Sequence, residues 1–106
     1  PMVALDRGGA EAMQSMLEGP TQAEGVRVRW PVRVNAILNE RDPSTRKIIG
    51  INEDELLSAF HYLPRRGIHV EPTSALAWAA YSQLRENLPE PIILILTGSG
   101  LKSTLS

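Results

Sequence analysis

Apolar runs alternate along the chain with segments of helical spacing. The runs that suit β-strands occupy residues 3–5, 47–51, 68–70 and 92–97. Between them, apolar side chains recur every three or four residues, which is the spacing of an amphipathic helix. These segments cover residues 10–18, 31–39, 52–63 and 73–87. Alternation of this kind predicts a three-layer α/β fold, in which a mostly parallel sheet is flanked by helices.

Capping residues mark the boundaries of the two C-terminal helices. Asn52 and Glu55 have the spacing of a capping box, and Gly67 suits the left-handed residue that follows a helix. Thr73 or Ser74 is expected to cap the last helix through its hydroxyl group. The strand at residues 92–97 is apolar on both faces, as a central strand of a parallel sheet would be.

Length and composition favour a single α/β domain over residues 1–106. Hydrophobic residues make up 42% of the chain and charged residues 22%, which excludes a disordered protein. The net charge of −1 excludes a nucleic-acid module that depends on bulk positive charge. Arg27, Arg29 and Arg33 beside Trp30 are therefore interpreted as the outward charges of an extended segment. A narrower alternative is that one of these arginines steadies an anionic substrate.

The absence of cysteines, of paired histidines and of a long apolar segment excludes several kinds of site. The chain has no cysteine, which excludes a disulfide scaffold, a thiolate zinc site and an iron–sulfur cluster. His61 and His69 lack the spacing of a metal site, so no metal ligand is assigned. The longest apolar run is too short to cross a bilayer, and no segment resembles a signal peptide. We therefore expect a cytoplasmic protein without nucleic-acid or membrane partners.

Two polar residues fall where ligands bind in α/β folds. Glu71 ends the run at residues 68–70, and Thr97 ends the last apolar run just before a glycine turn. Ligands of open α/β sheets bind beyond the carboxyl ends of the strands, so both side chains are expected to face one crevice. The alternative is structural, because hydroxyl residues such as Thr97 and Ser74 commonly cap turns and Glu71 can be a solvated strand-end acid.

The residues around these positions resemble a known enzyme family. Residues 67–75 read GIHVEPTSA, and residues 93–102 read ILILTGSGLK. Both segments, in this order and at this separation, resemble the C-terminal part of the pyridoxal-phosphate (PLP) enzymes of the tryptophan-synthase-β type, most closely the threonine synthases. Residues 23–28 with Pro31, and the acidic turn at residues 52–55, resemble the stretches that precede these motifs in the family.

The resemblance implies a partial cofactor site in this chain. Thr97 would place a neutral hydroxyl at the pyridine nitrogen, which favours elimination and replacement at the β or γ carbon. Gly98 would let the backbone approach the ring, and Glu71 would help to hold the pocket. The implied reaction of the parent enzyme converts O-phosphohomoserine to threonine and phosphate. Threonine dehydratase and cysteine synthase are alternatives within the same class.

The resemblance also implies that this chain does not catalyse the reaction alone. The family's Schiff-base lysine and its glycine-rich phosphate loop lie upstream of the matched motifs. Lys47 opens a predicted strand, and Lys102 matches the terminal motif of the family instead of its Schiff-base lysine. We therefore expect a fragment with no catalytic residue of its own, whose partner is the remainder of the parent enzyme. A non-catalytic α/β module that associates with itself as a homo-oligomer is the alternative from another class.

Overall fold

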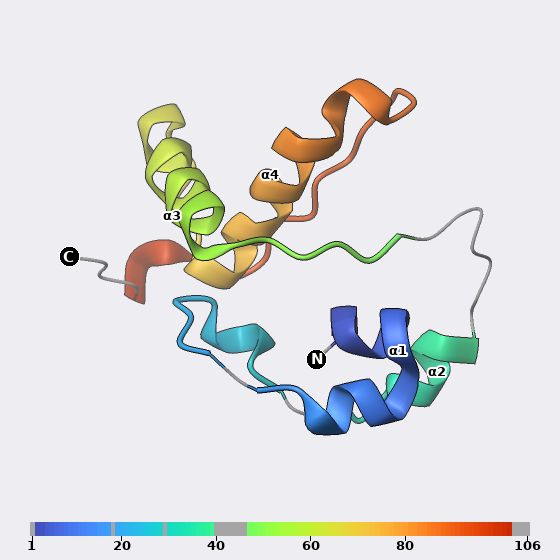
Figure 1. Ribbon diagram of the computed structural model, residues 1–106. Helices are drawn as coiled ribbons and strands as arrows, with labels where there is room; N and C mark the ends of the chain where they lie inside the picture. Colours follow the sequence, from blue (N-terminus) through green and yellow to red (C-terminus); the bar gives the residue numbers. More distant parts are fainter. Residues whose placement is uncertain (1, 18, 29, 40–46, 103–106) are drawn as a thin grey trace. The chain divides into compact units, whose positions relative to one another are not determined.

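The computed structural model describes residues 2–17, 19–28, 30–39 and 47–102 (Figure 1). The chain divides into two compact units, which are described separately. Unit 1 comprises residues 1–20 and 27–50, and unit 2 comprises residues 21–26 and 51–106.

Unit 1 contains two helices with a small apolar cluster. Helix α1 spans Met2–Ser15 and bends at Gly9, whose φ of 73° lies in the left-handed region that favours glycine. Helix α2 spans Val34–Asn39 and is preceded by a turn in which the Val34 amide donates to the Pro31 carbonyl over 3.1 Å. Among the residues of this unit whose side chains are described, Met13 and Val34 are buried, and Met2 packs against them.

Several expectations for unit 1 are wrong. The strand expected at residues 3–5 is part of α1, because alanine and leucine favour a helix and the described residues offer no strand for pairing. The helix expected from residue 31 begins three residues later. Val28 and Trp30, in the expected extended segment, are about half exposed, so neither side chain is buried. Arg29 lies outside the described residues.

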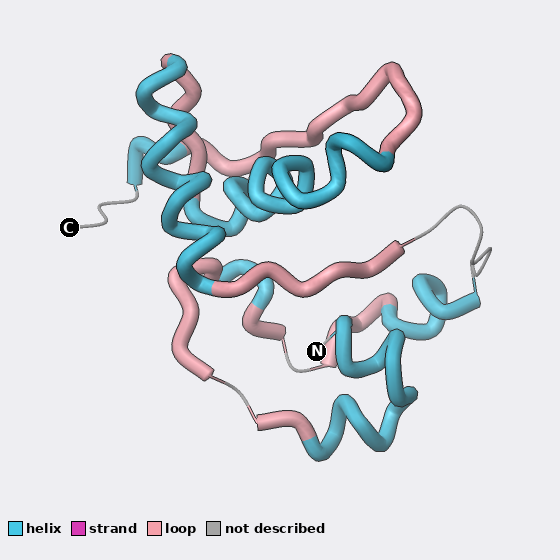
Figure 2. Tube along the Cα trace, turned by 45° about the horizontal axis from the view of Figure 1, so that its top comes forward, coloured by secondary structure: helices cyan, strands magenta, loops and turns pink. Residues whose placement is uncertain are grey.

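Unit 2 is built from two α-helices and several short 3₁₀ turns. Helix α3 spans Glu53–Tyr62, and helix α4 spans Pro72–Leu84. The 3₁₀ turns are η1 (Glu24–Val26), η2 (Leu63–Arg66), η3 (Arg85–Asn87) and η4 (Gly100–Lys102). In the ribbon view, α3 and α4 form a pair, and the chain after α4 runs back along that helix (Figures 1 and 2).

The predicted ends of α3 are confirmed. The Asn52 Oδ1 atom accepts from the Glu55 amide over 2.8 Å, and the Glu55 carboxylate accepts from the Asn52 amide over 3.0 Å. Three acidic side chains occupy the first turn, where the helix dipole favours negative charge. After the η2 turn, Gly67 adopts a φ of 80°, and its amide caps the turn by donating to the Pro64 carbonyl over 2.9 Å.

The core of unit 2 lies where α3 packs against α4. Small side chains at Ala59, Ala75 and Ala79 let the two helix backbones approach closely. The buried set is Ala23, Leu56, Ala59, Leu63, Val70, Ala75 and Ala79. The alanines of α4 therefore pack within a helix pair, and not against the sheet of the predicted three-layer fold.

The predicted α/β fold with a parallel sheet is wrong. In the part of the chain that the structure describes, the elements are helical and no strand is present. Val70 and Ser99 form an isolated bridge, and that bridge is antiparallel. A strand is stable only when a neighbouring backbone satisfies its amides and carbonyls, so an apolar run without such a neighbour stays extended but unpaired. This is the state of residues 47–51 and 92–97.

We predict that α3 depends measurably on its capping box. Asn52→Ala should lower the free energy of unfolding by about 1 kcal/mol, because the Glu55 amide in the first turn loses its side-chain acceptor. Urea titration followed by circular dichroism measures this loss. Asn52→Asp should retain most of the stability, and Asn87→Ala, at an exposed position of η3, serves as the control. An equal effect of the Asn52→Ala and Asn87→Ala variants would contradict the prediction.

Candidate functional site

The two motif segments of unit 2 meet at one place, which we call the 71–98 junction. It comprises residues 69–74, at the start of α4, and residues 97–100, which follow the last apolar run. The Glu71 amide donates to the Gly98 carbonyl, and the Gly100 amide donates to the His69 carbonyl, both over 3.1 Å. These two bonds frame the bridge between Val70 and Ser99. Segments more than 20 residues apart in the sequence are therefore joined through their backbones.

Ser74 adds a side-chain bond to the junction. Its hydroxyl oxygen accepts from the Thr97 amide over 2.8 Å, and the Ser74 residue itself is only 5% exposed. The Thr73 hydroxyl oxygen accepts from the Gly25 amide over 3.0 Å. The prediction that Thr73 or Ser74 caps α4 is therefore wrong, because Glu71 is the residue at the N-cap and it makes no side-chain cap bond. Both hydroxyl groups instead tie α4 to distant segments of unit 2.

The junction leaves no room for a side chain at position 98. A Cβ atom at this position would overlap the carboxyl group of Glu71, which packs directly over the glycine. Gly100 is similarly confined, since a Cβ there would lie 2.7 Å from the Val70 carbonyl oxygen. The space beside Gly98 that was expected to admit a cofactor ring is thus filled on this side by Glu71.

The structure brings together the residues that the sequence singled out. Glu71 is half-buried at the start of α4, its carboxyl group touches Gly98, and Thr97 is the next residue along the chain. The Thr97 side chain is exposed while its amide is held by Ser74. Two hollows of unit 2, one between α3 and α4 and one beside Tyr81, are not lined by these residues. The junction therefore presents an exposed threonine beside a hydrogen-bonded turn.

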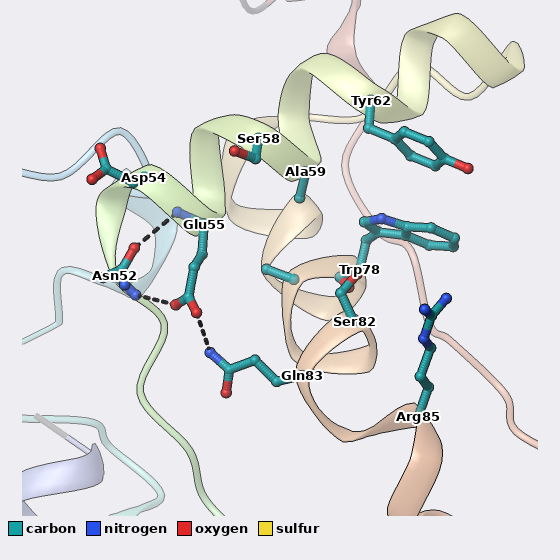
Figure 3. A pocket seen from close by; sticks show the side chains of 11 residues that line it. Asn52, Asp54, Glu55, Ser58, Ala59, Tyr62, Trp78, Ser82, Gln83 and Arg85 are labelled. Carbon is teal, nitrogen blue, oxygen red and sulfur yellow. Dashed lines mark hydrogen bonds between the residues drawn. The ribbon is translucent and has the colours of Figure 1, made fainter.

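A second candidate site is the groove between α3 and α4 (Figure 3). This α3–α4 groove has a volume of about 670 Å³ and an open mouth. One wall is aromatic, because the Tyr62 ring stacks on Trp78 with centroids 5.1 Å apart and an interplanar angle of 16°. The Arg66 guanidinium lies 5.2 Å from the centroid of the Tyr62 ring. Sequence reasoning did not identify these aromatic residues; the signal available was that Tyr62 and Trp78 each lie on a predicted helix.

Several polar side chains of the α3–α4 groove bond to one another or to the backbone. The Glu55 carboxylate accepts from the Asn52 amide through one oxygen and from the Gln83 side-chain amide, over 2.7 Å, through the other (Figure 3). The Ser82 hydroxyl donates to the Trp78 carbonyl within α4. The bond between Gln83 and Glu55 links the two helices on this side of the groove.

Other candidate groups do not assemble into a site. Among the described residues, no three histidine, aspartate or glutamate side chains gather where they could hold a metal ion. Arg27 and Arg33 are exposed. The described helices include none whose length and apolar character would let it span a membrane.

The chain was compared with protein-family models, curated proteins and solved structures, and none of them matches it. The interpretation of the site therefore depends on its residues and their geometry.

We predict that a side chain at position 98 disrupts the junction. Gly98→Ala should cost about 1–3 kcal/mol of unfolding free energy, because the added methyl group overlaps the Glu71 carboxyl. The cost should fall when Glu71→Ala is introduced first, and a double-mutant cycle in urea measures this coupling. Gly19→Ala is the matched control, since nothing lies within 4 Å of a Cβ at that position. Additive effects of the two junction substitutions would contradict the proposed overlap.

We also predict that Ser74 protects the Thr97 amide. Ser74→Ala removes the acceptor of that amide, so its hydrogen exchange should become about fivefold faster, which corresponds to the roughly 1 kcal/mol of a typical hydrogen bond. Exchange of the individual amides, followed by nuclear magnetic resonance, measures the effect. Ser82→Ala removes a hydroxyl bonded only within α4 and should leave the Thr97 amide unchanged. Unaltered protection of Thr97 in the Ser74→Ala variant would contradict the assignment.

Proposed function

We propose that this chain is the C-terminal part of a PLP-dependent lyase of the threonine-synthase type, and that its 71–98 junction forms one edge of the cofactor site. The substrate proposed for the whole enzyme is O-phosphohomoserine, which would be converted to threonine and phosphate. The chain would contribute cofactor-binding groups, while the remainder of the enzyme would contribute the lysine and the phosphate loop.

The observation that carries the proposal is the meeting of the two motif segments. Residues 67–75 and 93–102 carry the resemblance to the enzyme family, and it is these segments that the junction joins. The bonds are made by backbone amides and by the buried Ser74 hydroxyl. They therefore hold the main chain of residues 69–74 against that of residues 97–100. A pair of motifs with only local capping roles would not need to be adjacent.

The residues at the junction fit one edge of the cofactor. Thr97 offers a neutral hydroxyl that is exposed, and its backbone is held on the other side by Ser74. Such a hydroxyl can donate a hydrogen bond to the unprotonated ring nitrogen of a pyridine. Glu71 touches Gly98 instead of leaving that face open, so we assign it the role of bracing the turn and not that of contacting the ring.

The chemistry follows from the partner of the ring nitrogen. When bound, PLP supplies an electron sink for elimination and replacement reactions at the substrate's side-chain carbons. The Thr97 hydroxyl carries no charge, so as the partner of the ring nitrogen it would leave that nitrogen largely unprotonated and would moderate the electron sink. The bond from the Thr97 amide to Ser74 holds the backbone that carries this hydroxyl.

The proposal predicts that the hydroxyl at position 97 supports cofactor binding. In the protein expressed from the complete reading frame that contains this chain, Thr97→Val should weaken PLP binding about tenfold, since it loses roughly one hydrogen bond while keeping the side-chain shape. Thr97→Ser keeps the hydroxyl and should bind PLP almost as tightly as the unsubstituted protein. Titration of the visible absorbance with PLP measures both affinities, and phosphate release from O-phosphohomoserine measures the reaction.

The outcomes separate the enzyme class from the role of Thr97. A protein that shows no visible absorbance with PLP would contradict the proposed class. A protein that binds PLP equally tightly with valine or threonine at position 97 would contradict only the role of the hydroxyl. Binding of PLP without phosphate release would favour a threonine dehydratase or a cysteine synthase, which are the alternatives within this class.

A further inference from the structure

We propose that residues 92–96 of unit 2 form a site of self-association, in which the segment pairs as an antiparallel β-ladder with the same segment of a second copy of this chain. The inference concerns the 106-residue chain and does not depend on the proposed cofactor site.

The 92–96 segment has the side-chain pattern of a strand. Ile93 and Ile95 are 82% and 76% exposed, while the three residues that alternate with them are half-buried. Ile92 and Leu94 line a hollow with Trp78 and Tyr81 of α4, and Leu96 packs against the core of unit 2. One face of the segment is therefore covered by this chain, and the other face carries two isoleucines in solvent.

The backbone of the segment is extended but belongs to no β-pair among the described residues. Pairing begins only at Ser99, which bridges Val70. An unpaired extended backbone beside exposed β-branched side chains is a template for another strand. The Thr97 amide is held by Ser74, and the covered side chains lie along α4, so the segment is already ordered. A strand that is ordered in advance loses less conformational entropy when it binds.

The segment lacks the features that commonly protect an exposed strand. Protein edges are usually blocked by charged side chains, by prolines or by bulges. No charged residue occurs from residue 91 to residue 101, and no proline occurs after Pro91 in that stretch. Pro91 has no amide hydrogen, and the Gly98 carbonyl already accepts from Glu71, so the pairing is limited to the residues between them. The carboxylates of Glu71 and Glu90 therefore stay outside the ladder.

The sequence of the segment is complementary to itself. An antiparallel register with Leu94 opposite Leu94 places Ile93 of one copy opposite Ile95 of the other, on the same exposed face. In the same register Ile92 lies opposite Leu96. This arrangement has a two-fold axis and closes as a dimer, whereas parallel stacking of identical strands would continue as a fibre. Cross-strand pairs of β-branched residues stabilise such a ladder.

The first experiment compares two double variants of the 106-residue chain. Sedimentation equilibrium from about 10 μM to about 1 mM covers the affinities of weak interfaces, and the chain should shift from monomer to dimer in this range. Ile93→Lys with Ile95→Lys should weaken the dimer at least tenfold. Leu17→Lys with Val32→Lys also converts two exposed apolar residues, which are 95% and 96% exposed, and should leave association unchanged. Circular dichroism checks that both variants keep their helices.

The second experiment tests the register by disulfide formation. The chain contains no cysteine, so single substitutions report one position at a time. Ile93→Cys mixed with Ile95→Cys should form the mixed disulfide at least threefold faster than either variant alone forms its own, because these positions are paired across the axis. The Val32→Cys variant gives the background rate. Since both reactive positions are exposed, this test does not require a substitution in the core.

Four results would overturn the inference. They are a chain that stays monomeric up to the highest concentration, equal weakening by the two lysine pairs, no preference for the mixed disulfide, and fibres that bind amyloid dyes in place of a closed dimer. Dimer formation that the 93 and 95 lysines abolish, together with the mixed-disulfide preference, would support it.

Discussion

The backbone contact between the start of α4 and the turn after the last apolar run organises unit 2. Two amide–carbonyl bonds and the Ser74 hydroxyl fix this 71–98 junction, and the carboxyl group of Glu71 fills the space beside Gly98. Because the chain after α4 must return to reach this point, it runs back along that helix (Figure 1). Ile92 and Leu94 of this returning segment line a hollow with Trp78 and Tyr81 of α4. The placement of Thr97 and the exposure of residues 93 and 95 both follow from the 71–98 junction.

The 71–98 junction also explains why the described apolar runs do not form a sheet. A sheet needs several neighbouring backbones, and the junction supplies pairing only around Val70 and Ser99. Residues 92–96 are left extended, with one face against α4 and the other in water. Both faces of this segment are apolar, which indicated a central strand. In the structure only the face formed by residues 92, 94 and 96 is covered. The same feature supports two proposals, a segment of a larger enzyme and a surface for a second copy.

The candidate site was partly predictable. Glu71, Thr97 and Gly98 were selected from the sequence, and the structure places them beside one another. The partner of Gly98 was not predictable, since the overlap with Glu71 depends on the path of two distant segments. The aromatic wall at Tyr62 and Trp78 was also missed, because stacking between two helices leaves no pattern within either helix.

The sequence by itself determined the features that depend on residues within one or two helical turns. Asn52 and Glu55 set the start of α3, and Gly67 sets the end of the turn that follows it, because capping bonds join residues only a few positions apart. Only the tertiary structure decided whether the apolar runs paired and which partners Thr73 and Ser74 bonded. Each of these outcomes depends on backbone or side-chain groups from distant parts of the chain. The local sequence pattern does not specify which distant groups come together.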